Sequence, residues 1–68
     1  MKLSRPQIVD GALALLADEG LDGFSLRRLG PRLGVETPAI YWHVRSKSEL
    51  MGLMAAQLHL RARAANPE

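Results

Sequence analysis

Three side chains that join an aromatic ring to a polar tip stand side by side near the middle of the chain. Tyr41 and Trp42 are its only tyrosine and tryptophan, and His43 follows them directly. Arg45 and Lys47 come next, so hydrogen-bonding ring groups and positive charges are concentrated in one short stretch. The face of such a ring packs against apolar groups, while its polar end forms hydrogen bonds with a partner or with water. We therefore predict that this stretch forms a contact surface.

Charge is distributed unevenly along the chain, although the net charge is only +2. Residues 1–23 hold two basic and four acidic residues, whereas residues 24–48 hold five basic residues and one acidic residue. A basic run alone is usually a solvated face, and Arg28 and Arg32 are interpreted as solvated or steering charges. The coincidence of the basic excess with the aromatic rings indicates a surface for DNA.

Length and composition argue against several other functions. A chain of 68 residues makes one small domain and leaves no room for a deep catalytic cleft. The absence of cysteine removes disulfides and thiolate metal sites, and the two histidines have no carboxylate pattern around them. No nucleophile and base, carboxylate pair or phosphate loop is recognisable, so we expect no enzyme. No apolar run is long enough to cross a membrane, so we expect a soluble, cytoplasmic protein.

Helical signals organise the whole chain, and the first predicted helix covers residues 5–19. Ser4 and Gln7 form a capping box at its start, and Pro6 lies in its first turn. Gly20 ends it, and Leu21 is expected to fold back on the last turn. One apolar stripe faces the core and consists of Ile8, Val9, Ala12, Leu13, Leu15 and Leu16.

A second, shorter helix is predicted between Ser25, which caps its start, and Gly34, which closes it. Its inward residues are Leu26, Leu29 and Leu33. Proline removes a backbone hydrogen bond inside a helix, so Gly30-Pro31 predicts a kink or a 3₁₀ segment.

A third short helix is predicted from about Thr37, with Pro38 as its first residue and Ile40 and Val44 facing inward. The second and third helices, separated by a glycine-containing turn, form a helix-turn-helix over about residues 25–44. The second helix of such a pair enters the DNA major groove.

A fourth helix begins at the capping box of Ser46 and Glu49 and ends before Asn66-Pro67. From Gln57 onward it carries apolar residues that the rest of the chain is too small to cover. It therefore frays or belongs to a larger protein. The predicted fold is all-α: a three-helix, homeodomain-like helix-turn-helix bundle followed by the start of a fourth, connecting helix.

The order of these motifs resembles the N-terminal DNA-binding domain of TetR-family transcriptional regulators over residues 4–60. The matching motifs are the capped first helix ending in Glu-Gly, then Gly-Phe-Ser-Leu-Arg-Arg-Leu, Leu-Gly-Val, Pro-Ala-Ile-Tyr-Trp-His-Val and Ser-Lys-Ser-Glu-Leu. The Tyr-Trp-His-Val tetrad is nearest to the tetracycline repressor branch. Gly30-Pro31 stands where members of this family usually have two helix-favouring residues in the second helix. Thr37 replaces a longer amide, which implies a different operator sequence.

The resemblance implies a role for each matching residue. Those reading bases would be Arg27, Thr37, Pro38 and Ala39, the last two through thymine methyl groups. Those holding DNA phosphates would be Ser25, Tyr41, Trp42, His43 and Lys47. The residue types alone leave alternatives, because the Tyr41 and Trp42 rings could cover the core and His43 could interact with a helix dipole.

The resemblance also implies a ligand-released repressor that binds a palindromic double-stranded DNA operator as a homodimer. Residues 61–68 would be the end of the connecting helix, and the ligand-binding and dimerisation domain expected after them is absent. No cofactor is expected in this segment, and the small-molecule effector of the missing domain is unknown. The alternative function is a helical protein-interaction module that uses the fourth helix.

Overall fold

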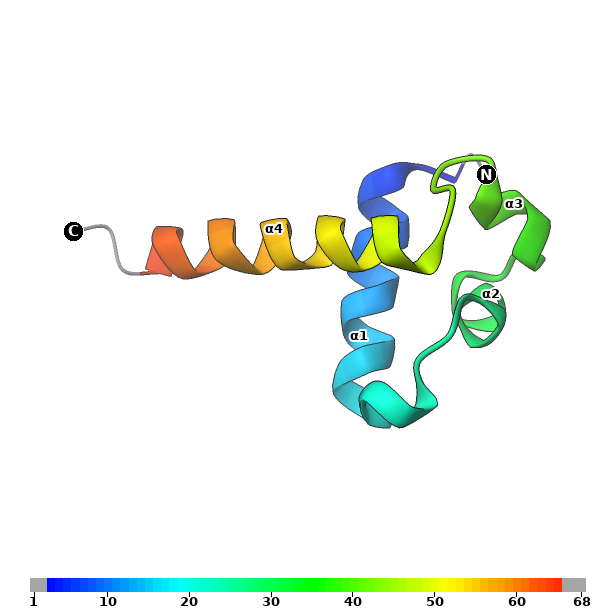
Figure 1. Cartoon of the computed structure of the whole chain (residues 1–68), viewed down its shortest axis with the longest axis horizontal. Coiled ribbons are helices and arrows are strands. Elements are labelled where there is room, and N and C mark those ends of the chain that lie inside the picture. Colours follow the sequence, from blue (N-terminus) through cyan, green and yellow to red (C-terminus); the bar gives the residue numbers. More distant parts are fainter. Residues whose placement is uncertain (1–2, 66–68) are drawn as a thin grey trace.

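The computed structural model describes residues 3–65, which form four α-helices and no strand (Figure 1). The helices are α1 (Arg5–Gly23), α2 (Leu26–Leu33), α3 (Thr37–Tyr41) and α4 (Lys47–Ala65). α1 packs against both α2 and α4, and α2 packs against α3. α4 crosses α1 and extends away from the bundle, and α3 lies at the opposite end of the molecule (Figure 1). The all-α helix-turn-helix prediction is confirmed.

The start of α1 is capped as predicted. The Ser4 hydroxyl accepts a hydrogen bond from the Gln7 N–H at 3.3 Å, and the Ser4 N–H donates to the Gln7 side-chain oxygen at 2.8 Å. These two bonds satisfy amide groups that have no partner within the helix.

Gly20 interrupts α1, with φ 75° and ψ 178°. This backbone conformation is almost confined to glycine. The prediction that Leu21 folds back on the helix is wrong, because its side chain is 68% exposed. The reason is the extended ψ of Gly20, which directs the chain outward, whereas a helical C-cap glycine has a ψ near 45°.

α2 begins and ends as predicted. The Ser25 hydroxyl accepts from the Arg28 N–H at 3.1 Å, and Gly34 closes the helix in the left-handed region, with φ 72° and ψ 28°. The predicted kink at Gly30-Pro31 is wrong, because the α-helix runs without interruption from Leu26 to Leu33. Pro31 has no N–H, so the carbonyl of Arg27, four residues earlier, loses its helical hydrogen bond. Arg27 is exposed, so water can bind that carbonyl instead.

One hydrophobic core joins the four helices and the loops between them. Ile40 and Val44 are fully buried in it, as predicted, so α3 and the turn that follows are anchored to the bundle. The buried residues are Ile8, Val9, Ala12, Leu15, Phe24, Leu26, Leu29, Ile40, Val44, Leu50 and Met54.

α4 starts at the predicted capping residues, with one difference in the bonding. The Glu49 N–H donates to the Ser46 hydroxyl at 3.1 Å, but the Glu49 carboxylate accepts from the N–H of Arg45, one residue before the cap, at 2.8 Å. Beyond the core, Leu58 is 50% and Leu60 61% exposed, so the predicted uncovered end is confirmed. The predicted stop at Asn66-Pro67 lies outside the described residues. No helix within residues 3–65 is long and apolar enough to span a bilayer.

Candidate nucleic-acid interface

α3 is a short helix held from inside, with its outer surface open to solvent. Ile40 is fully buried, Thr37 and Ala39 are half-buried, and Pro38 and Tyr41 are exposed. The helix begins at Thr37, so Pro38 is its second residue and not the first as predicted. Short or rigid side chains at the leading end of a helix let its backbone approach a partner closely.

The aromatic turn, which we define as Tyr41, Trp42 and His43, lies at the end of α3. Trp42 is 84% exposed, so the alternative that its ring covers the core is wrong. Tyr41 is 49% exposed and His43 is half-buried. The His43 N–H donates to the Ile40 carbonyl at 3.0 Å, which ties the turn back to the buried residue of α3. The indole of Trp42 is therefore accessible to a partner, with an apolar face and an N–H donor both open to solvent.

α2 contributes Ser25 and Arg27 to the same part of the fold. Arg27 is exposed near the start of the helix, and its guanidinium can fork onto two acceptors. Ser25 uses a hydroxyl lone pair to cap α2, so its O–H proton stays available for donation to a partner.

Lys47, the first residue of α4, is exposed, and its Nζ lies 5.8 Å from the centroid of the Phe24 ring. Phe24 is buried in the core. A cation this close to an aromatic face is attracted to the ring. The contact connects the loop before α2 to the start of α4 and limits where the ammonium group can point.

Two arginines of α2 are exposed, in agreement with the prediction of solvated charges, but each also forms an ion pair that was not predicted. Arg28 Nη1 lies 2.8 Å from Glu19 Oε1, and the Arg32 guanidinium pairs with the Asp18 carboxylate. Both arginines therefore reach the last part of α1. The adjacent acidic residues at that helix end were the sequence signal for these pairs. Exposed pairs stabilise a fold by about 1 kcal/mol or less, but they offset the local positive charge. The basic surface near α3 therefore rests mainly on Arg27, Arg45 and Lys47.

Sequence reasoning assigned no role to Arg5, which the fold brings to the aromatic turn. Its Nη2 donates a hydrogen bond to the His43 carbonyl at 3.1 Å, across 38 residues of chain. No local sequence pattern predicts a contact over that separation.

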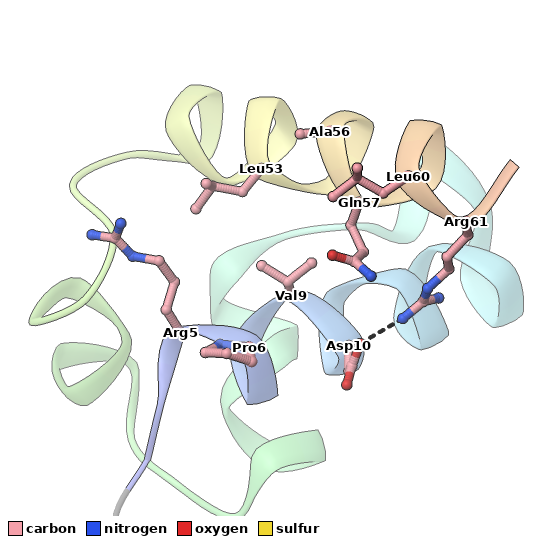
Figure 2. Close-up of a pocket in the computed structure, with 9 residues that line it drawn as sticks. All are labelled: Arg5, Pro6, Val9, Asp10, Leu53, Ala56, Gln57, Leu60 and Arg61. Atoms are coloured by element: carbon pink, nitrogen blue, oxygen red, sulfur yellow. Dashed lines mark hydrogen bonds and ion pairs between the residues drawn. The ribbon is translucent and has the colours of Figure 1, made fainter. Parts of the chain in front are cut away.

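A groove of about 370 Å³ separates the first half of α1 from the middle of α4 (Figure 2). At one end Arg61 binds Asp10 at 2.7 Å, a pair that bridges α1 and α4. Its remaining lining residues are Arg5, Pro6, Val9, Leu53, Ala56, Gln57 and Leu60. Within residues 3–65 no three histidine, aspartate or glutamate side chains gather as a metal site would require.

Comparisons with known proteins agree with this geometry. Residues 8–54 match the family described as bacterial regulatory proteins, tetR family. The class D tetracycline repressor of Escherichia coli is 40% identical over 60 residues, covering 88% of this chain and 28% of that protein. The class C tetracycline repressor of Escherichia coli is 46% identical over 54 residues, covering 79% of this chain and 25% of that protein.

A solved structure shows the same fold. It is a TetR-family transcriptional regulator from Streptomyces coelicolor, with a TM-score of 0.75 and 49% identity, covering 81% of this chain and 32% of that one. The chain spans only about a quarter of the length of the curated relatives it matches.

Proposed function

The chain belongs to the tetR family of bacterial regulatory proteins, and from this premise we propose that it is a sequence-specific binder of double-stranded DNA. α3 would lie in the major groove, and the turns on either side of it would hold the phosphate backbone. The observation that carries the proposal is α3 itself, anchored by buried Ile40 and followed by an 84% exposed Trp42 beside exposed basic residues. Residues 4–60 would act as the DNA-binding domain.

Each residue of this surface is assigned a role from its position. Arg27 would read guanine through its fork, and Thr37, Pro38 and Ala39 would contact base edges and thymine methyl groups. These four residues lie on α2 and the leading end of α3. The residues that would bind phosphates are Ser25, Tyr41, Trp42, His43 and Lys47.

In the whole protein, this domain would be the DNA-binding part of a transcriptional repressor. Two copies would place α3 in successive major grooves, roughly 34–36 Å apart, on a palindromic operator. Dimerisation and release by a small-molecule effector would belong to residues beyond the length that this chain spans. The complex would form in the cytoplasm, where the DNA is.

The proposal is tested by an amide NMR titration of the 68-residue chain with a mixed-sequence duplex at two salt concentrations. Shifts should concentrate at residues 25–28 and 37–47, and binding should weaken steeply as salt rises, because phosphate contacts release counterions. Shifts that are insensitive to salt and centred on residues 53–60 would reject the proposal. They would favour a protein-interaction module that uses α4.

Arg27→Ala is expected to relax sequence preference more than it weakens binding in general. The fork to guanine is lost, so discrimination at one or two base pairs should fall by about 1–3 kcal/mol. The measurement is selection of bound duplexes from a randomised pool, followed by affinities for the preferred site and single-base variants.

Lys47→Ala provides the contrast in the same experiment. It should weaken all sequences alike and reduce the slope of log affinity against log salt by about one, because a phosphate contact carries no sequence information. If Arg27→Ala also weakened every duplex equally, its assignment to a base contact would be wrong.

A further inference from the structure

The Arg5 side chain crosses from α1 to the end of the helix-turn-helix. Figure 2 shows its guanidinium directed at the segment that leads into α4. There its Nη2 donates to the His43 carbonyl at 3.1 Å. Arg5 is exposed, and it is the first residue of α1. One arginine thus connects the start of the first helix to the last residue of the aromatic turn.

The place of Arg5 in α1 gives no local reason for a positive charge. The start of a helix carries a partial positive charge from its unpaired amides, so a cation there is unfavourable. No acidic residue lies in the first turn to offset it. Among residues 3–65, the Arg5 side chain donates one hydrogen bond, to His43, so the interaction that offsets this position lies in the turn and not in the helix.

The aromatic turn is held by backbone bonds on its inner side and by the Arg5 bond on its outer side. On its inner side, the N–H groups of His43 and Val44 donate to the Ile40 carbonyl at 3.0 and 3.1 Å. Trp42 is 84% exposed and has almost no packing of its own. The Arg5 bond therefore adds a tertiary hydrogen bond to the anchoring of the turn by buried Val44, and it constrains the His43 carbonyl and with it the direction of the rings before it.

We propose that Arg5 is a positioning residue for DNA binding, which holds the aromatic turn in its binding geometry through the His43 carbonyl. This role rests on the proposed function and extends it to a residue outside the helix-turn-helix. Without Arg5 the turn would sample other conformations, and binding would have to order it at a cost in affinity.

The test compares Arg5→Ala with the unmodified chain by DNA affinity, by its salt slope and by Trp42 fluorescence anisotropy. Affinity for every duplex should fall about tenfold, the usual size of a lost charged hydrogen bond. The salt slope should stay unchanged, because Arg5 binds the turn and not a phosphate. Trp42 is the only tryptophan, so faster nanosecond anisotropy decay in the free variant would report the loosened turn directly.

Arg63→Ala is the matched control, because it removes the same charge from an exposed position at the far end of α4. It should change neither the affinity nor the Trp42 anisotropy. The melting temperature of Arg5→Ala should stay near that of the unmodified chain, because the lost bond is offset by removing a cation from the start of α1.

Three results would overturn the role of Arg5. These are normal affinity, unchanged Trp42 anisotropy, or a salt slope reduced by about one, which would make Arg5 itself a phosphate ligand. Failure of the unmodified chain to bind any duplex would instead overturn the proposed function. The two failures are therefore distinguishable.

Discussion

Replacing Ile40 with alanine is expected to lower the free energy of unfolding by about 2–5 kcal/mol, the usual cost of truncating a buried isoleucine. Ile40 is fully buried and is the residue through which α3 joins the core. Small domains are near the lower end of the 5–15 kcal/mol range of protein stabilities, so a loss at the upper end of this estimate would leave a large part of the variant unfolded at room temperature. Urea unfolding followed by helical circular dichroism measures the change.

Leu60→Ala is the control for this prediction, since it removes a side chain of similar size that is 61% exposed. It should change the free energy of unfolding by less than about 1 kcal/mol. Equal losses for the two variants would mean that Ile40 does not anchor α3 as described. DNA affinity of Ile40→Ala, corrected for its folded fraction, should still be reduced because α3 loses its support.

Gly30→Ala is expected to destabilise the chain and to displace the leading end of α3. A Cβ at residue 30 would lie 2.8 Å from the Val35 carbonyl oxygen and 3.7 Å from the Thr37 hydroxyl. The Val35 N–H donates to the Gly30 carbonyl at 3.0 Å, so the turn is already drawn tightly onto α2. Moving backbone atoms to relieve such an overlap costs about 1–3 kcal/mol, which exceeds the gain in helix propensity of about 1 kcal/mol.

Gly52→Ala is the matched control, because Gly52 lies within α4 and an added Cβ would have no neighbour within 4 Å. That variant should be more stable by about 0.5–1 kcal/mol. The same unfolding experiment, with DNA affinity measured for both variants, decides the matter. A stabilised Gly30→Ala with normal affinity would show that the turn is not closely packed against α2.

The helix starts were predictable because a cap is a local interaction. Ser4, Ser25 and Ser46 each accept a hydrogen bond from the backbone N–H three residues later, and that spacing is visible in the sequence. The inward direction of Ile40 and Val44 followed in the same way from helical periodicity. The prediction of a kink at Pro31 was wrong because helix propensity gives only the average cost of proline in a helix. In this chain the burial of Leu29 and Gly30 holds the helix in place.

The candidate site also has features that the sequence predicted and features that it did not. Its composition could be predicted, since the rings and basic residues are neighbours in the chain, and a resemblance in motif order assigned a role to each. Their exposure could not be predicted, and neither could the bond from Arg5 to His43. For the ion pairs of Arg28 and Arg32 the sequence offered adjacent acidic residues as a signal, but not which residues pair. Those features depend on how α1 lies against the other helices.

The sequence by itself determined the helical class, the helix starts and the place of the aromatic turn, because caps and periodicity act over a few residues. Only the tertiary structure decided that Trp42 is solvated, that Gly30 lies against Val35 and that Arg5 reaches His43. These contacts join residues whose separation is set by the packing of whole helices. Their energies depend on distance and burial, which appear only when the chain is folded.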